Sequence, residues 1–212
     1  VDKFGADTLR CYEMFLGPLE QAKPWDTQGI NGVHNFLRRF WNLSHKDGKL
    51  AISEGEPTKD ALKSLHKTIQ KVEDDINRYS FNTPVSALMI CVNELNEQKC
   101  NNREIIEQLT IVLSSYAPHI AEELWQELGH RESINSASYP TFNPAYLIED
   151  SYQYPVSFNG KMRFKLEVPR ETPKDEVEKL ALADERAQKW LDGVTIRKVI
   201  VVPGKIVNVV VG

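Results

Sequence analysis

The spacing of the apolar residues changes once along this sequence, and the change limits the folds that the chain can adopt. Up to about residue 128 they recur every three or four positions, which places them on one face of an α-helix. From Tyr154 onward they alternate with other residues, as in a β-strand with one buried face. The sequence therefore predicts an α+β chain, an antiparallel α-helical bundle followed by a small β-β-α-β-β domain.

The helical part begins with a segment that Gly17-Pro18 ends. Residues 26–47 are predicted to form a long helix that ends at Gly48, with Pro24-Trp25-Asp26 at its start and Asp26 or Thr27 as N-cap. The clearest pattern follows a capping residue, Thr58, and comprises Leu62, Leu65, Ile69, Val72 and Ile76. Further helices are predicted from Asn82 to Leu95, from Ile105 to Leu113 and from Pro118 to Leu128.

The C-terminal part contains a strong hairpin signal, Asn159-Gly160, which favours a type I′ turn. Alternation along the second strand predicts that Lys161, Arg163 and Lys165 lie together on one face. One helix is predicted between Pro173 and Gly193, and two strands flank Pro203-Gly204. One helix would then pack on the apolar face of one sheet.

These patterns predict three regions. Residues 1–130 form the helical domain, residues 131–150 a polar, Pro-containing linker along the surface, and residues 151–212 the small α/β domain. Of the composition, 41% is hydrophobic and 26% charged, which is typical of a soluble globular protein. No stretch approaches the roughly 18 apolar residues of a membrane helix, so no membrane contact is expected.

The three cysteines, Cys11, Cys91 and Cys100, have no CxxC spacing. They predict neither a disulfide framework nor a zinc ribbon, and they fit a reducing, cytoplasmic location with buried or idle thiols.

The net charge of -4 gives no overall attraction to nucleic acid. The charge is unevenly distributed, however. Residues 1–148 carry 15 Lys+Arg against 20 Asp+Glu, a balance of -5, and residues 149–212 carry 11 against 10, a balance of +1.

The sequence shows no catalytic centre: it has no glycine-rich phosphate loop, no HExxH and no serine elbow. His119 lies near Glu122-Glu123, but the spacing is poor for a metal site. A structural, hydrogen-bonded His119 is therefore expected, with no catalytic residue, metal or cofactor in this chain.

The segment FGADTLRCYEMFLGPLEQAKPW, from Phe4 to Trp25, resembles the leucyl-tRNA synthetases, a family of class I aminoacyl-tRNA synthetases. In that family it follows the Lys-Met-Ser-Lys-Ser loop, which this sequence lacks together with the nucleotide-binding fold and the editing domain. The resemblance implies the C-terminal part of such an enzyme, starting at Val1, with the anticodon-binding helical domain first and no ligase activity of its own.

The resemblance also implies two tRNA-binding surfaces. The motif RRFWN supplies Arg38, Arg39 and Asn42, and resembles the helix that lies inside the tRNA L. Arginines pair with phosphates and asparagines reach ribose hydroxyls. The alternative is two solvated arginines on a bundle surface, with Phe40 and Trp41 in the core.

The second surface is the hairpin NGKMRFK, which resembles a family motif that contacts the tRNA elbow and long variable arm. Phe164 stands where the family commonly has Gly, and its ring is expected either to stack on RNA or to pack. The candidate RNA-binding residues here are Asn159, Lys161, Arg163, Lys165, Arg197, Lys198 and Lys205. The alternative is a set of charges that solvate an exposed sheet face.

For the parent enzyme the resemblance implies ATP-dependent attachment of leucine to its tRNA, with ATP and magnesium bound by other domains. The expected partners are leucine tRNA isoacceptors and the parent's catalytic domains, and the expected state is a monomer. The corresponding regions of isoleucyl-, valyl- or methionyl-tRNA synthetases are alternatives. A helical protein-interaction module, whose apolar stripes hold partner helices, is an alternative from another class.

Overall fold

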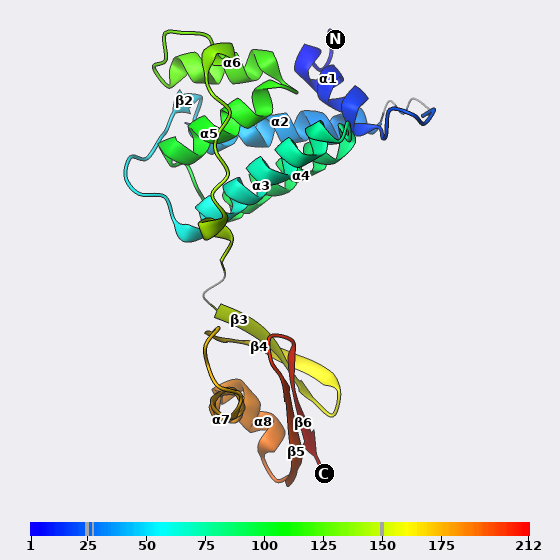
Figure 1. Ribbon diagram of the computed structural model, residues 1–212, viewed down its shortest axis with the longest axis vertical. Coiled ribbons are helices and arrows are strands. Elements are labelled where there is room, and N and C mark those ends of the chain that lie inside the picture. Colours follow the sequence, from blue (N-terminus) through cyan, green and yellow to red (C-terminus); the bar gives the residue numbers. More distant parts are fainter. Residues whose placement is uncertain (24–25, 27, 149–150) are drawn as a thin grey trace. The chain divides into compact units, whose positions relative to one another are not determined.

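The computed structural model describes residues 1–23, 26, 28–148 and 151–212. These residues divide into two compact units, Val1–Leu147 and Ile148–Gly212 (Figure 1). The first is helical and the second is built on a four-stranded sheet, so the predicted α+β class is confirmed. Three residues at the predicted start of the second helix, Pro24, Trp25 and Thr27, lie outside the described residues.

The helical unit consists of amphipathic helices, and its last four helices follow one another with short connections. They are α1 (Ala6–Phe15), α2 (Ile30–Ser44), α3 (Lys59–Asn77), α4 (Asn82–Glu97), α5 (Arg103–Ser114) and α6 (Pro118–Glu127). Thr58 caps α3, as predicted, because its side chain accepts a hydrogen bond from the Ala61 amide. Asn102 caps α5 in the same way through the Ile105 amide. Within the described ranges, no helix is both long enough and apolar enough to cross a bilayer.

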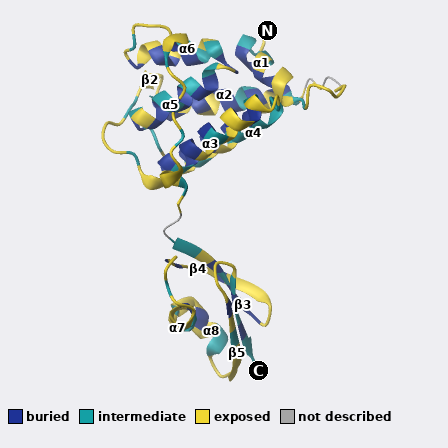
Figure 2. Cartoon of the chain, in the orientation of Figure 1, coloured by how far each residue is buried: buried dark blue, intermediate teal, exposed yellow. Residues whose placement is uncertain are grey.

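The core of the helical unit lies where the apolar faces of these helices meet (Figure 2). Phe36 and Phe40 of α2, Leu65 of α3 and Leu109 of α5 are fully buried. Each such side chain contributes about 1.5–3 kcal/mol when it leaves water. Cys11 and Cys91 are also buried, and burial raises the pKa of both thiols to about 12, so neither is a reactive thiolate at neutral pH.

Helix α2 is shorter than predicted, because it ends at Ser44 rather than near Gly48. A small hairpin follows, in which β1 (His45–Lys46) pairs with β2 (Lys49–Leu50). Asp47 and Gly48 both have positive φ, 52° and 73°, which suits a tight two-residue turn. The sequence DG was therefore a turn signal and not a helix end.

Residues 131–147 lie against the helical unit and include two short 3₁₀ turns, η1 (Ile134–Ser136) and η2 (Pro144–Leu147). Ile134 is buried against Trp125 of α6. The Tyr139 hydroxyl donates to the Ile69 carbonyl of α3 at 3.1 Å. Glu149 and Asp150, at the predicted domain boundary, lie outside the described residues.

The second unit contains β3 (Ser151–Phe158), β4 (Lys161–Pro169), α7 (Lys174–Ala183), α8 (Glu185–Leu191), β5 (Ile196–Val202) and β6 (Ile206–Val211). Its strands lie in the order β4-β3-β6-β5, with β3 and β6 parallel and the other pairs antiparallel. Val177 of α7 and Ala187 of α8 pack on one face of this sheet, against residues such as Val156 and Val207.

The single helix predicted between Pro173 and Gly193 is in fact two helices. Asp184 has an extended conformation, with φ -62° and ψ 132°, and its side chain accepts a hydrogen bond from the Arg186 amide. Asp184 thus ends α7 and caps α8, as expected of a residue type that prefers N-caps to helix interiors.

Candidate nucleic-acid interface

The exposed side of α2 carries the first set of predicted RNA-binding residues. Arg38, Arg39 and Asn42 are all exposed, whereas Phe40 is 1% exposed and packs in the core. Arg38 and Asn42 are one turn apart and share one edge of the helix. The Arg38 guanidinium donates to the Asn35 side-chain oxygen at 3.1 Å. Helix packing therefore leaves the polar edge of α2 open to a ligand.

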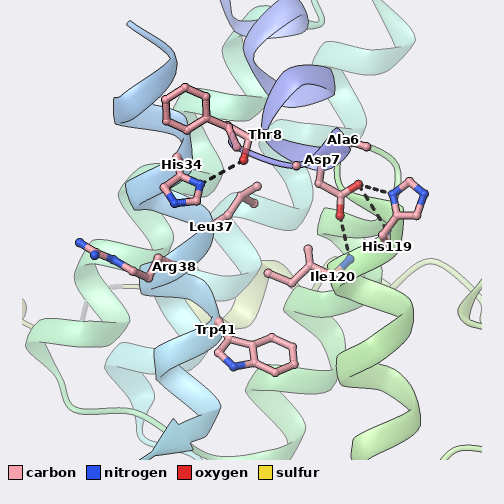
Figure 3. Close-up of a pocket in the computed structure, with 11 residues that line it drawn as sticks. Ala6, Asp7, Thr8, His34, Leu37, Arg38, Trp41, His119 and Ile120 are labelled. Atoms are coloured by element: carbon pink, nitrogen blue, oxygen red, sulfur yellow. Dashed lines mark hydrogen bonds and ion pairs between the residues drawn. The ribbon is translucent and has the colours of Figure 1, made fainter. Parts of the chain in front are cut away.

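A pocket of about 460 Å³ opens beside this edge, between α1, α2 and the start of α6 (Figure 3). It is lined by Phe4, Gly5, Ala6, Asp7, Thr8, His34, Leu37, Arg38, Trp41, His119 and Ile120. Arg38 extends away from Asp7 and His119 in Figure 3, so its guanidinium belongs to the rim of the pocket. The indole of Trp41 stacks on His45, with ring centroids 4.1 Å apart. Trp41 is half-buried, not a core residue.

Asp7 ties α1 to the start of α6. Its carboxylate accepts hydrogen bonds from the Ile120 amide at 2.7 Å and from the His119 amide at 3.4 Å. It also lies 2.7 Å from Nδ1 of the His119 ring. Because Ala117 offers no side-chain cap, Asp7 takes that role for α6 across the fold. His119 therefore has the structural, hydrogen-bonded setting that the sequence indicates.

Among the residues that the structure describes, no group of three or more His, Cys, Asp or Glu side chains is placed to hold a metal ion. Asp7, the carboxylate that lines the pocket, is engaged with the backbone and with His119. The pocket also offers apolar walls, ring faces and a guanidinium at the rim.

The Asn159-Gly160 turn forms as predicted, with φ 47° and 80° at its two residues. The Asn159 side chain donates to the Val211 carbonyl and accepts from the Val211 amide, at 3.1 and 3.0 Å. Asn159 thus fastens the hairpin to β6. Phe164 packs: it is 8% exposed and belongs to the core of the unit, so its ring is not available for stacking on RNA.

The prediction that Lys161, Arg163 and Lys165 share one face is wrong. A β-bulge shifts the register between β3 and β4, so that Val156 pairs with Phe164 but Ser157 pairs with Met162. Arg163 is the extra residue of this bulge, and its guanidinium carbon lies 3.7 Å from the centroid of the Trp190 ring of α8. A bulge interrupts the strict alternation of a strand, and nothing in the spacing of the apolar residues shows it.

The strand partners place the other two lysines. Lys161 pairs with Phe158, a core residue, and paired residues project from the same face, so Lys161 belongs to the helix-covered side. Lys165 pairs with Pro155, one position from the buried Val156, and so belongs to the open face. The hairpin therefore presents cations on both sides of the sheet.

The remaining predicted cations lie at the opposite edge of the sheet. Arg197 and Lys198 are exposed residues of β5, next to a second bulge between Ile196 and Lys198. Because β3 and β6 lie between β4 and β5, these cations are about 14 Å from strand β4, at about 4.8 Å per strand. Lys205 is exposed in the turn before β6. The structure does not gather the predicted cations into one patch.

The sequence reasoning missed the α8 residues Arg186, Lys189 and Trp190, which lie beside Arg163 and Phe164 of the hairpin. Arg186 lies over the Phe164 ring at 4.6 Å, and Nζ of Lys189 is 5.4 Å from the Trp190 centroid. Arg186 also bonds Asp184, with donor–acceptor distances of 2.9 and 2.7 Å. That hydrogen bond, despite an opposing effect of burial, lowers the pKa of Asp184. In the sequence, the one signal was the spacing of four between Arg186 and Trp190, which places two residues on the same face of a helix.

The protein-family description "Anticodon-binding domain of tRNA ligase" matches residues 58–179, more than half of the chain. Curated relatives called leucine–tRNA ligase are 60% identical in Christiangramia forsetii, 59% in Cytophaga hutchinsonii and 57% in Bacteroides thetaiotaomicron. These alignments cover 98%, 99% and 100% of this chain, but only 22%, 23% and 22% of the relatives.

A solved structure covers the same length. It is the ternary complex of an Agrobacterium radiobacter K84 LeuRS with tRNA and LeuAMS, which matches with a TM-score of 0.67 and 25% identity. The match covers 100% of this chain and 30% of that one. This chain therefore belongs to the family of tRNA-ligase anticodon-binding domains and corresponds to a part of the bacterial leucine–tRNA ligases.

Proposed function

We propose that this chain is the tRNA-binding C-terminal part of a leucine–tRNA ligase. It holds leucine tRNA while domains outside this sequence attach leucine at the expense of ATP, with magnesium. The observation that carries the proposal is the similarity, over the full chain, to a LeuRS whose solved structure includes tRNA. The role is positional: contacts far from the reacting atoms fix the acceptor end of the tRNA where chemistry takes place.

In this proposal the α2 edge is the contact surface of the helical unit. Arg38 and Arg39 pair with phosphates, and Asn42 bonds ribose hydroxyls. Two observations support it: all three side chains are exposed, and the pocket beside Arg38 offers apolar and ring surfaces for an unstacked base. The unit as a whole is acidic, so binding depends on this local geometry and not on overall charge.

The small unit contributes the second surface, which reaches the elbow and the long variable arm. Lys161, Arg163, Lys165, Arg197, Lys198 and Lys205 supply phosphate contacts, and Asn159 holds the hairpin in place. Residues 1–130, 131–150 and 151–212 act as helical domain, linker and C-terminal domain. The protein works as a monomer in the cytoplasm, which suits its free thiols, two of which are buried.

A salt series tests this proposal directly. The chain is titrated with a fluorescently labelled leucine tRNA transcript between 50 and 200 mM salt. If about six to eight phosphates are contacted, the affinity falls by about 10³- to 10⁴-fold over that range. A protein-interaction module would bind through apolar surface instead, and its contact with RNA would be absent at every salt concentration. Absence of binding at 50 mM salt contradicts the proposal.

A further inference from the structure

Three cations lie over aromatic rings at helix α8, and the strand partner of a fourth assigns it to the same helix-covered side of the sheet. They are Lys161 and Arg163 of β4 and Arg186 and Lys189 of α8, and we call them the α8 cluster. Arg163 and Lys189 both lie over the Trp190 ring, at 3.7 and 5.4 Å from its centroid. Arg186 lies over the Phe164 ring, at 4.6 Å. The bulge in β4 assembles the cluster, because it places Arg163 against α8.

The cluster carries excess positive charge. Arg186 is paired with Asp184, so that its charge is largely matched. In the part of the chain that the structure describes, no carboxylate lies within 4 Å of the cationic groups of Arg163 or Lys189. Both residues are exposed, so an approaching anion meets charges that no described carboxylate pairs with.

The Trp190 ring attracts the Arg163 guanidinium, whose carbon lies 3.7 Å from the ring centroid. A guanidinium over an indole face is held by cation–π attraction, and its N–H groups lie around its rim. Those groups form the planar fork that binds two oxygens of one phosphate. Stacking lowers the conformational entropy that Arg163 loses on binding, so the site is prepared before the ligand arrives.

We propose that the α8 cluster is a phosphate-binding site for the tRNA backbone, on the helix-covered side of the small unit. The inference rests on the proposed function and deepens it, because it adds two α8 residues, Arg186 and Lys189, to the RNA-binding surface. Arg163 and Lys189 contact phosphates directly, and Lys161 continues these contacts along β4. Arg186, which is paired with Asp184, borders the site. The RNA contact therefore wraps over the β4 edge rather than lying flat on the open face.

The test compares two charge reversals in the full 212-residue chain. Lys189→Glu lies in the cluster, and Lys179→Glu is the control, because Lys179 is exposed on α7 and causes the same change of charge. Affinity for a leucine tRNA transcript is measured at several salt concentrations. K189E is expected to bind about tenfold more weakly than K179E and to lose about one unit of salt slope. Equal affinities of the two variants overturn the inference.

Arg163→Lys tests the stacked guanidinium separately. It keeps the charge but removes the planar fork, so tRNA binding is expected to weaken about threefold or more with an unchanged far-UV spectrum. Wild-type affinity in a folded R163K protein would contradict a role for the fork.

Lysine acetylation of the wild-type chain gives a readout that needs no substitution. Lys161 and Lys189 should become protected when tRNA is added, while Lys174 and Lys179 should keep their reactivity. Equal protection of all four lysines, or of none at saturating tRNA, contradicts the site. If the wild-type chain binds no tRNA, the proposed function itself fails. If it binds tRNA but Lys161 and Lys189 stay unprotected, the proposed function stands and this inference fails.

Discussion

At the scale of single residues, burial decides which of the candidate side chains can meet a ligand. Phe40 and Phe164 belong to the two motifs that resemble tRNA-binding segments, yet both are core residues. Arg38 and Arg39, which precede Phe40, are exposed and have no carboxylate partner among the described residues. Substitution of these arginines should thus affect binding and leave stability almost unchanged.

Arg38→Ala together with Arg39→Ala is expected to weaken tRNA binding by about 2 kcal/mol, or about thirtyfold, because charged hydrogen bonds to phosphate are lost. The melting temperature should change little. The control is Arg10→Ala with Arg131→Ala, which removes the same charge from exposed positions elsewhere in the helical unit. A large fall in melting temperature, or equal binding by both double variants, would mark Arg38 and Arg39 as structural.

His66 predicts a pH dependence of stability. It accepts a hydrogen bond from the Asn143 amide and stacks on Tyr146, with centroids 4.6 Å apart. Burial lowers the pKa of His66 below 6.5, although Glu104 acts in the opposite direction. Below pH 6.5 the unfolded chain therefore binds more protons at this position than the folded chain, and stability falls as the pH falls.

His66→Gln keeps a hydrogen-bond acceptor but does not titrate. Thermal unfolding between pH 7.5 and 5 should show a smaller loss of melting temperature for this variant than for the wild type. Parallel curves for the two proteins would show that His66 does not carry the effect.

At the scale of elements, short polar contacts fix where helices and strands start and stop. Asp7 of α1 caps α6, so a residue more than one hundred positions away in sequence supplies what the local sequence lacks. Asp184 divides α7 from α8, and Asp47-Gly48 forms the turn of the hairpin that follows α2.

Asp7→Ala is expected to destabilise the helical unit by about 1–3 kcal/mol, because the Ile120 amide loses its partner. His119→Ala is the control. The His119 side chain is 71% exposed, and its loss leaves both amide bonds to Asp7 intact, so it should cost less than about 0.5 kcal/mol. Urea unfolding followed at 222 nm measures both. Equal costs would show that the contact of Asp7 with the His119 ring, and not the cap, stabilises α6.

Gly160→Ala tests the turn that sets the hairpin. At φ 80° a side chain costs about 1 kcal/mol, and no atom lies near enough to the new methyl group to add a clash. Gly32→Ala, in the helical backbone of α2 with open space around it, should instead stabilise by about 0.5–1 kcal/mol. Opposite signs in calorimetry are expected, and stabilisation by both substitutions would contradict the assigned turn.

The buried faces of the helices could be predicted from sequence, because apolar residues such as Leu65 and Ile69 recur at helical spacing and so lie on one buried face. The bulge at Arg163 could not, since alternation is a local pattern and a bulge depends on the register with another strand. The cluster of Arg163 with Trp190 was hidden for the same reason. Arg38 and Lys165 are thus exposed, as a binding role requires. The prediction that the three hairpin cations share one face is wrong.

At the scale of the whole molecule, the two units divide the proposed work. The acidic helical unit offers a narrow polar edge on α2, and the small unit offers cations on both faces and edges of one sheet. The chain spans only 22% of the relative in Christiangramia forsetii. The proposed function gives the chemical step to domains outside this sequence. The central claim is that this part of the enzyme binds tRNA by its shape and backbone.

The most direct measurement of that claim is the affinity of the unmodified chain for two tRNA transcripts at one salt concentration. One transcript is leucine tRNA, with its long variable arm, and the other is a tRNA with a short arm and the same leucine anticodon. The account predicts at least about tenfold tighter binding of the long-armed tRNA, because more phosphates are reached. Equal affinity for both, or preference for the short-armed tRNA, would contradict it.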